Sequence, residues 1–177
     1  MILLIKERHD FKTLNKTEMI EVKQGPFNNN KDKKKNQNKP KYTRINYNSN
    51  NTTRMDIPEK LIRERVRKMA ATGLKIHFSE LDIIFNTHDD SRGGGEQIYS
   101  EVTSEMLEQQ AQKYEIVAKI YREEVPKEQQ FGITFWDFTD RDTWINPFFG
   151  LNDWPTIFNK ELKPKPAYYG FKKGLAE

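Results

Sequence analysis

Two carboxylates near the end of a short apolar stretch are the residues whose types and spacing first suggest chemistry. The stretch is GLKIHFSELDI, residues 73–83, and its acids are Glu80 and Asp82. Its composition predicts a buried strand, where a carboxylate is costly unless it is paired or functional. An acid at such a strand end is a nucleophile, a general base or a metal ligand, or else one partner of a structural ion pair. Spacing alone leaves these alternatives open.

Two tryptophans supply a second signal. Trp136 ends another apolar stretch, FGITFWDF over residues 131–138, and Trp144 lies in the segment beyond it. A flat indole ring suits the apolar face of a sugar, although a lone Trp more often belongs to a core. Because both tryptophans flank the polar segment TDRD beside the same predicted edge as Glu80, they favour a carbohydrate site.

Helices and strands alternate along the part of the chain that must position these residues. Apolar periodicity predicts a helix over residues 57–72, a strand over 74–84, a helix from Ser104 to Pro126, a strand over 131–138 and a helix over 165–176. Strands joined by helices of this length pair in parallel, and ligands bind at their carboxyl ends. Glu80, Asp82, Trp136 and Asp140 all fall at those ends. Asp56 and Ser104 are expected to cap the first two helices.

The amino-terminal part differs in composition from the rest. Residues 28–54 contain nine Asn and eight Lys or Arg but a single acid, although the net charge of the whole chain is only +4. Such a segment cannot offset the entropy lost on ordering, so residues 1–54 are expected to be a disordered leader, unrelated to a domain over residues 55–177. The leader is either an arm for nucleic acid or a solvated tail. The tail is favoured because a basic run alone is a weak signal.

No cofactor and no metal are expected. The chain has no cysteine, which excludes disulfides and thiolate metal sites. The glycines at 93–95 are not followed by the Lys of a phosphate loop, and the acids of residues 88–96 are interpreted as solvated. The apolar run at residues 1–5 is too short for a signal-peptide core or a membrane span, so no membrane partner is expected and the localisation stays open.

Three ordered segments resemble the end of glycoside hydrolase family 10, the retaining endo-β-1,4-xylanases. Residues 73–83 are similar to the family's nucleophile strand, in which Ser or Thr precedes the Glu and an aliphatic residue and Asp follow it. Residues 133–144, ITFWDFTDRDTW, resemble the eighth strand and its loop, and residues 158–169, FNKELKPKPAYY, resemble the closing segment. The resemblance implies an α/β fold, the C-terminal portion of a (β/α)8 barrel with about its last two strands and flanking helices. Asp137 departs from the pattern, because the family commonly has Gly there.

The resemblance also implies a mechanism. Retaining glycosidases use one carboxylate to attack the anomeric carbon and a second to protonate the leaving oxygen. By the match, Glu80 is the nucleophile, Trp136 and Trp144 shape the subsite for the attacked sugar, and xylan or a xylooligosaccharide is the substrate. Asp82 and His77 are supporting residues. His77 has the wrong strand parity for direct contact, so a packing role is favoured for it.

The second carboxylate has no match in the sequence. In the family this acid/base Glu follows an Asn, and the chain contains no Asn-Glu pair. The chain is therefore expected to be a truncated xylanase with little or no activity alone, whose missing strands a complementing chain would carry. The alternative is a non-catalytic remnant that binds xylan or docks on a partner. The inward faces of Ile76, Phe78, Ile133 and Phe135 are expected to be exposed without those strands.

Overall fold

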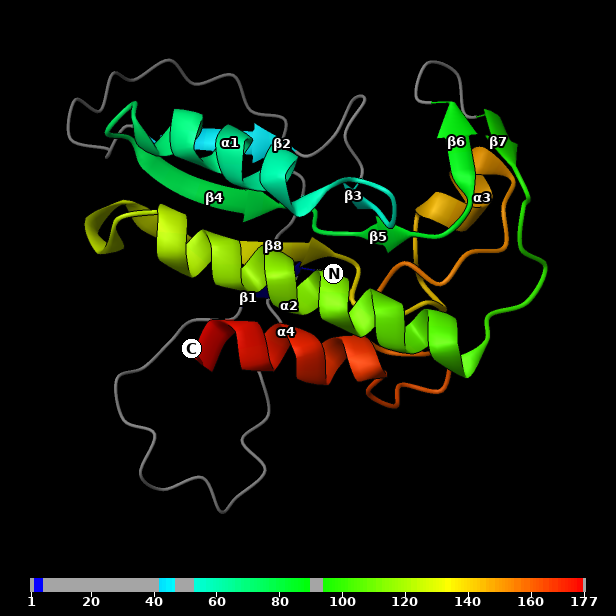
Figure 1. Cartoon of the computed structure of the whole chain (residues 1–177). Coiled ribbons are helices and arrows are strands. Elements are labelled where there is room, and N and C mark those ends of the chain that lie inside the picture. The colour runs from blue at the N-terminus through cyan, green and yellow to red at the C-terminus, as the bar shows by residue number, and fades with distance from the viewer. Residues whose placement is uncertain (1, 5–41, 47–52, 90–93, 177) are drawn as a thin grey trace, which may run out of the picture.

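The fold is built around a four-stranded sheet (Figure 1). A computed structural model describes residues 2–4, 42–46, 53–89 and 94–176. The strand order is β1-β8-β4-β2, with bounds Ile2–Leu4 for β1, Gln130–Trp136 for β8, Lys75–Ser79 for β4 and Tyr42–Asn46 for β2. β2, β4 and β8 are parallel neighbours, whereas β1 is antiparallel to β8. Smaller sheets pair β3 (Thr53–Arg54) with β5 (Ile83–Ile84), and β6 (Thr87–Asp89) with β7 (Gly94–Glu96).

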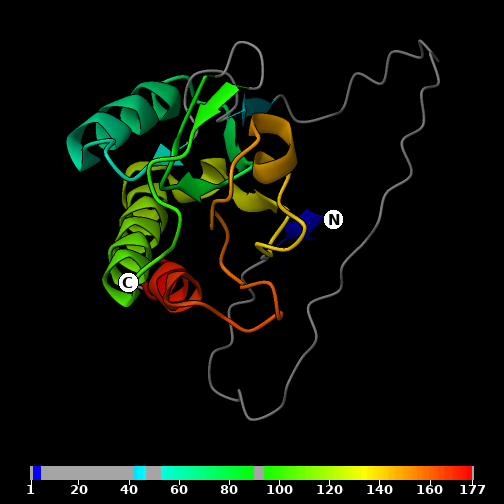
Figure 2. The same ribbon diagram turned by 90° about the vertical axis from the view of Figure 1, so that its right-hand side faces the viewer.

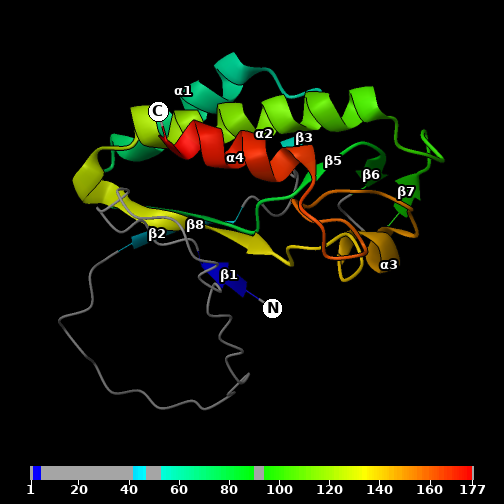
Figure 3. The same ribbon diagram turned by 90° about the horizontal axis from the view of Figure 1, so that it is seen from below.

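Helices follow the parallel strands and cover one face of the sheet, as Figures 2 and 3 show. α1 (Glu59–Ala70) precedes β4, α2 (Ser104–Glu124) precedes β8, and α4 (Pro166–Ala176) follows β8. Two short helices lie in connecting segments, η1 (Lys127–Gln129) and α3 (Ile145–Phe149). The predicted alternation of three helices with two strands is confirmed. Parallel strands separated by helices are the repeating unit of a (β/α)8 barrel.

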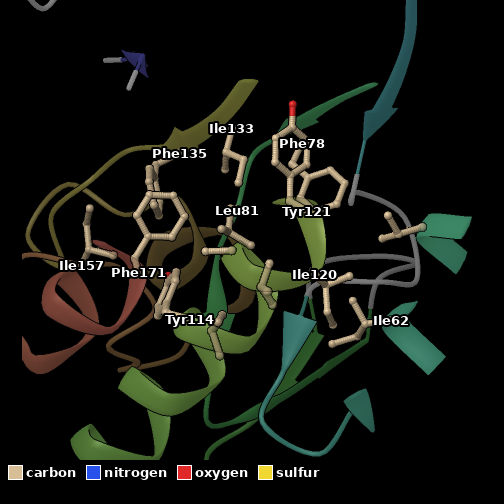
Figure 4. Close-up of a cluster of buried hydrophobic side chains, with 14 of the residues drawn as sticks. Ile62, Phe78, Leu81, Tyr114, Ile120, Tyr121, Ile133, Phe135, Ile157 and Phe171 are labelled. Carbon is tan, nitrogen blue, oxygen red and sulfur yellow. The ribbon is translucent and has the colours of Figure 1, made fainter. Parts of the chain in front are cut away.

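The hydrophobic core lies between the sheet and the helices (Figure 4). Ile76, Phe78, Ile133 and Phe135 are each at most 4% exposed. The ring of Phe78 packs edge-on against Tyr121 of α2, with centroids 4.9 Å apart. The expectation that these four side chains are exposed is therefore wrong. Strand alternation turns them toward the helices, which bury them, and turns the polar side chains toward the other face.

The helix starts differ slightly from the predicted ones. Pro58 precedes α1 and makes no side-chain cap, so Asp56 does not occupy the cap position. Thr103 caps α2, because its hydroxyl accepts a hydrogen bond of 3.2 Å from the backbone nitrogen of Met106. Thr103 and Ser104 are adjacent and both suit a cap, so residue type alone could not choose between them.

α2 and α4 lie side by side (Figures 1 and 3) and approach closely at two glycines. A Cβ atom on Gly170 would lie 2.1 Å from the carbonyl oxygen of Ala111, and one on Gly174 would lie 2.3 Å from that of Glu115. Both obstacles are backbone atoms of α2, four residues apart and therefore on one face of the helix. The two helices thus meet backbone to backbone at these points.

The sheet reaches into the segment expected to be a leader. β2 pairs with β4 in a regular parallel register, from Tyr42 opposite Lys75 to Asn46 opposite Ser79. The run Tyr-Thr-Arg-Ile is β-prone, and a count of Asn and Lys over residues 28–54 hides it. Strand β2 of the four-stranded sheet therefore lies on the leader side of the boundary predicted at residue 54. The rest of the expected leader, residues 1, 5–41 and 47–52, lies outside the described residues.

Within the described ranges, no helix combines the length and the apolar content that a membrane crossing requires. In the same ranges, His, Asp and Glu side chains form no group of three or more that could hold a metal ion. Residues 90–93 of the acidic segment lie outside those ranges.

Candidate active site

Glu80 lies directly after β4, in a backbone conformation that is rare for residues other than glycine. Its φ angle is +75°, in the left-handed region. The turn breaks the strand alternation, because Leu81 enters the core at 1% exposure while Glu80 stays half-buried outside the core cluster. Such a conformation costs about 1–3 kcal/mol, and residues that adopt it cluster at functional sites. The predicted strand over residues 74–84 therefore ends at Ser79, one residue before the candidate nucleophile.

Thr134 of β8 holds this turn in place. Its carbonyl oxygen accepts hydrogen bonds from the backbone nitrogens of Glu80 at 2.8 Å and Leu81 at 3.1 Å. Its hydroxyl lies 2.6 Å from Nε2 of His77, so His77 connects β4 to β8. Thr134 is 4% exposed and fixes Glu80 relative to the neighbouring strand. Sequence reasoning missed Thr134, although a polar residue inside an apolar strand was an available signal.

Asp82 is buried and bound to one of the two predicted tryptophans. Nε1 of Trp144 donates a hydrogen bond of 3.0 Å to Oδ2 of Asp82, which is 3% exposed. Within the described part of the chain, Oδ1 of Asp82 has no hydrogen-bond partner. Burial raises the pKa of Asp82 well above its ordinary value, the negative charges of Asp137 and Glu80 raise it further, and the Trp144 hydrogen bond opposes them.

Trp144 is half-buried beside the aromatic rings of α3. Its ring centroid lies 5.5 Å from that of Phe148 and 5.6 Å from that of Phe149. Phe149 belongs to a small apolar cluster apart from the main core, Trp144 packs against that cluster, and Phe148 is exposed. Trp144 therefore has an indole nitrogen bound to Asp82 and a ring packed against α3, which fixes its orientation.

Trp136 is the last residue of β8 and is half-buried. It lies two residues after Thr134, on the strand face that points away from the helices. Asp137 follows with a φ angle of +62°, again in the left-handed region. This conformation explains why glycine suits the position in the family pattern, and Asp is one of the residues that tolerate it. Burial raises the pKa of Asp137.

A buried ion pair fixes the segment that follows β8. Nζ of Lys165 lies 2.9 Å from Oδ2 of Asp140, and their side chains are 5% and 2% exposed. Oδ1 of Asp140 also accepts hydrogen bonds from the backbone nitrogen and the hydroxyl of Thr156. Burial raises the pKa of Asp140 and lowers that of Lys165, because desolvation outweighs their mutual attraction. Asp140, predicted at a strand end, therefore anchors a loop.

Asp153 anchors the same loop to the segment after β5. Its carboxylate accepts hydrogen bonds from the backbone nitrogens of Phe85 at 3.1 Å, Asn86 at 2.7 Å and Trp154 at 2.7 Å. It is fully buried, and burial raises its pKa although these hydrogen bonds oppose the shift. Phe85 and Asn86 are 68 and 67 residues away in the chain, and no local sequence pattern reveals these two contacts.

These residues gather at one edge of the sheet. Glu80 and Trp136 lie at the ends of adjacent parallel strands, and Asp82 and Trp144 join the loops beyond them. Parallel strands with covering helices define the class: this is part of a (β/α)8 barrel. The candidate residues lie at the carboxyl ends of its strands, where barrels of this class carry their active sites. Residues 43–173 match the model of glycosyl hydrolase family 10, and the chain belongs to that family.

Similar proteins of the family are longer than this chain. The chain is 34% identical over 120 residues to endo-1,4-beta-xylanase A of Cellvibrio japonicus, a match that covers 65% of this chain and 20% of that protein. It is 38% identical over 110 residues to endo-1,4-beta-xylanase A of Caldicellulosiruptor saccharolyticus, covering 61% and 30%. The matched part is thus about a fifth to a third of the length of these relatives.

Similar solved structures are also longer than this chain. A thermostable mutant of a xylanase from Cellvibrio japonicus has a TM-score of 0.60 and 32% identity, covering 71% of this chain and 38% of that one. A mutant xylanase A of P. fluorescens subsp. cellulosa in complex with xylopentaose has a TM-score of 0.60 and 31% identity, with the same coverage of both chains.

Proposed function

We propose that Glu80 is the nucleophile of a retaining endo-1,4-β-xylanase site and that xylan is its substrate. The observation that carries the proposal is the left-handed turn at Glu80, held at the carboxyl end of β4 by Thr134. Catalytic groups of such barrels come from the strand ends, and strained backbone is kept where function needs it. Similar proteins named as xylanases, one bound to xylopentaose, support the choice of substrate.

In this proposal a carboxylate oxygen of Glu80 attacks the anomeric carbon of a xylose unit. The bond to the glycosidic oxygen breaks, that oxygen takes a proton from an acid, and water later releases the sugar from the ester. Trp136 and Trp144 hold the attacked sugar. Asp82 acts as a supporting residue because it orients Trp144, and His77 because it connects β4 to Thr134.

The proton donor is the second part of the proposal. A retaining mechanism needs two carboxyl groups about 5–5.5 Å apart, and the sequence has no Asn-Glu pair of the kind that resembles the family's acid/base. We propose that this chain alone does not cleave xylan. A partner chain that carries the acid/base Glu and further strands would complete the site.

The test separates nucleophilic attack from protonation. A dinitrophenyl 2-fluoro-β-xylobioside has a leaving group that departs without a proton, and its fluorine slows release of the covalent intermediate. We expect the full chain to gain one fluoroxylobiosyl group, located at Glu80 by peptide mass spectrometry. Glu80→Gln is expected to gain none. Glu64→Gln, an exposed position on α1, is the matched control and is expected to be labelled like the wild type. Equal labelling of Glu80→Gln would overturn the proposal.

A second candidate is binding of xylan without cleavage, which the missing Asn-Glu pair favours. Retention of the chain on insoluble xylan, its loss in Trp136→Ala and the absence of a covalent adduct would together support this candidate. An adduct at Glu80 would exclude it.

A further inference from the structure

A pocket of about 250 Å³ lies outside the site described above, near the segment after β5 and the start of α2. Ile98 and Tyr99 line it from the segment after β7, Met106 and Gln109 from α2, and Met55 from the segment before α1. Neither Glu80 nor either proposed sugar-binding tryptophan lines this pocket.

Hydrogen bonds from the buried side chain of Asn86 and the exposed side chain of Gln97 hold the segment that carries Ile98 and Tyr99. Asn86 is 1% exposed, and its Oδ1 accepts hydrogen bonds from the backbone nitrogens of Ile98 at 2.8 Å and Tyr99 at 2.7 Å. The side chain of Gln97 binds both backbone groups of Asn152, accepting at 2.7 Å and donating at 3.0 Å. The backbone beside the pocket is therefore fixed from both sides, as a preorganised binding wall requires.

This fixed segment presents apolar side chains to solvent. Ile98 is 51% exposed and Tyr99 is 45% exposed. About half of each side chain is therefore open to solvent at the edge of the pocket, where a ligand can cover it. An aromatic ring with a polar tip, held at the edge of a pocket, is suited to stacking against a ligand.

The lining also limits the chemistry of that ligand. None of the described residues that line the pocket is Lys or Arg, so none of them neutralises an anion such as a phosphate or an acidic sugar. Its described polar side chains are Asp56, Asn86, Thr87, Tyr99 and Gln109. A carboxylate, two amides and two hydroxyls suit a neutral ligand with several hydroxyls. The pocket is smaller than the usual site for a drug-sized molecule, so its volume fits a ligand of about one or two sugar rings.

We propose that this pocket is a second carbohydrate site, which binds a neutral sugar unit with its apolar face on Tyr99. The choice of sugar rests on the proposed function, because it assumes that the polysaccharide bound by the chain is xylan. The site itself needs neither Glu80 nor an acid/base group.

One NMR titration of the full chain with xylotetraose tests both sites. Met55 and Met106 line the pocket, so their labelled methyl groups report on it, and Met69 of α1 is the internal control. The indole signals of Trp136 and Trp144 report on the proposed active site. We expect the methyl signals of Met55 and Met106 to shift in a saturable manner while that of Met69 does not.

Variants then identify the contact. Tyr99→Ala is expected to weaken binding seen at the Met106 methyl group about fivefold or more, and Tyr169→Ala, an exposed tyrosine of α4, is expected to leave it unchanged. Indole shifts without methyl shifts would overturn the second site and leave the proposed function standing. Methyl shifts without indole shifts would overturn the proposed sugar-binding role of Trp136 and Trp144 and leave the second site standing. Methyl shifts that Tyr99→Ala does not weaken would also overturn the proposal.

Discussion

The indole nitrogen of Trp144 donates a hydrogen bond of 3.0 Å to Asp82, a residue 62 positions earlier in the chain. This contact joins the turn after β4 to the loop after β8. Asp82 is two residues from Glu80, so the orientation of an aromatic side chain and the path of the backbone near the candidate nucleophile depend on one buried carboxylate.

Replacing Trp144 with Phe is expected to destabilise the chain by about 1–3 kcal/mol. The ring packing against α3 is largely kept, but Asp82 loses its hydrogen-bond donor while it stays buried. Urea denaturation measures the change. Phe148→Leu, an exposed neighbour in the same aromatic group, is the control and should cost less than the Trp144 variant. Equal losses would show that packing, not the hydrogen bond, is what matters.

Asp82→Asn is expected to make the stability of the chain less dependent on pH. The pKa of Asp82 is raised by burial, so the folded chain holds this proton more tightly than the unfolded chain. The contribution is present below the ordinary Asp pKa and is lost as pH rises through the raised value, by about 1.4 kcal/mol for each pKa unit. Asp140 and Asp153 act with the same sign, so only the difference between the two chains is diagnostic. The measurement is the free energy of unfolding of the wild type and of Asp82→Asn between pH 4 and pH 8. If the two free energies change with pH by the same amount, this assignment is contradicted.

Lys165→Met is expected to cost about 3–5 kcal/mol, because it leaves the buried carboxylate of Asp140 without its cation. The double variant Asp140→Asn/Lys165→Met should recover much of that loss, since no charge is then buried. Thermal unfolding of the two single variants and the double variant gives the coupling. If the losses of the single variants simply add, the pair is not acting as a unit.

Gly170→Ala is expected to destabilise by about 1–3 kcal/mol, because the new Cβ would overlap the carbonyl oxygen of Ala111. The sign is informative, since Gly→Ala at a free helix position stabilises by up to about 1 kcal/mol. Lys172→Ala, at an exposed position on the same helix, is the control. A more stable Gly170→Ala chain would show that α2 and α4 are farther apart than described.

Asp137→Gly is expected to stabilise the chain by about 1 kcal/mol, because glycine adopts a φ angle of +62° without strain. The same variant removes a carboxylate that raises the pKa of Asp82. Equilibrium unfolding measures the first effect, and Asp137→Ala, which keeps the strain and removes the charge, separates the two. A chain that is less stable with Gly than with Ala would contradict the conformational argument.

The sequence predicts the alternation of helices and strands well, because apolar periodicity is local. It does not tell which face of a strand meets the helices. Ile76 and Phe78 were therefore correctly placed in a strand but on the wrong face. β2 was missed because a β-prone run of only four residues lies in an Asn- and Lys-rich segment, and pairing with β4 is a tertiary effect.

In the candidate site, too, local patterns could be read from the sequence and tertiary contacts could not. Glu80 and Trp136 were selected from the sequence because they lie near the ends of predicted strands, and Trp144 because it lies in the segment beyond the second one. Their roles stay predictions. Thr134 and Asp153 were not found, since each acts through backbone groups more than 50 residues away. The left-handed turn at Glu80 was also not predicted, because nothing in the residue type indicates it.

The close approach of α2 and α4 also bears on the history of the gene. Every missense change of a glycine codon adds a Cβ, and at Gly170 and Gly174 that atom meets backbone. Without selection, missense changes accumulate at these two codons as fast as at the codon of Lys172. If selection maintains a folded product, alleles with such changes are removed from the population. Allele frequencies at these codons across natural isolates would therefore show whether selection still maintains this fold.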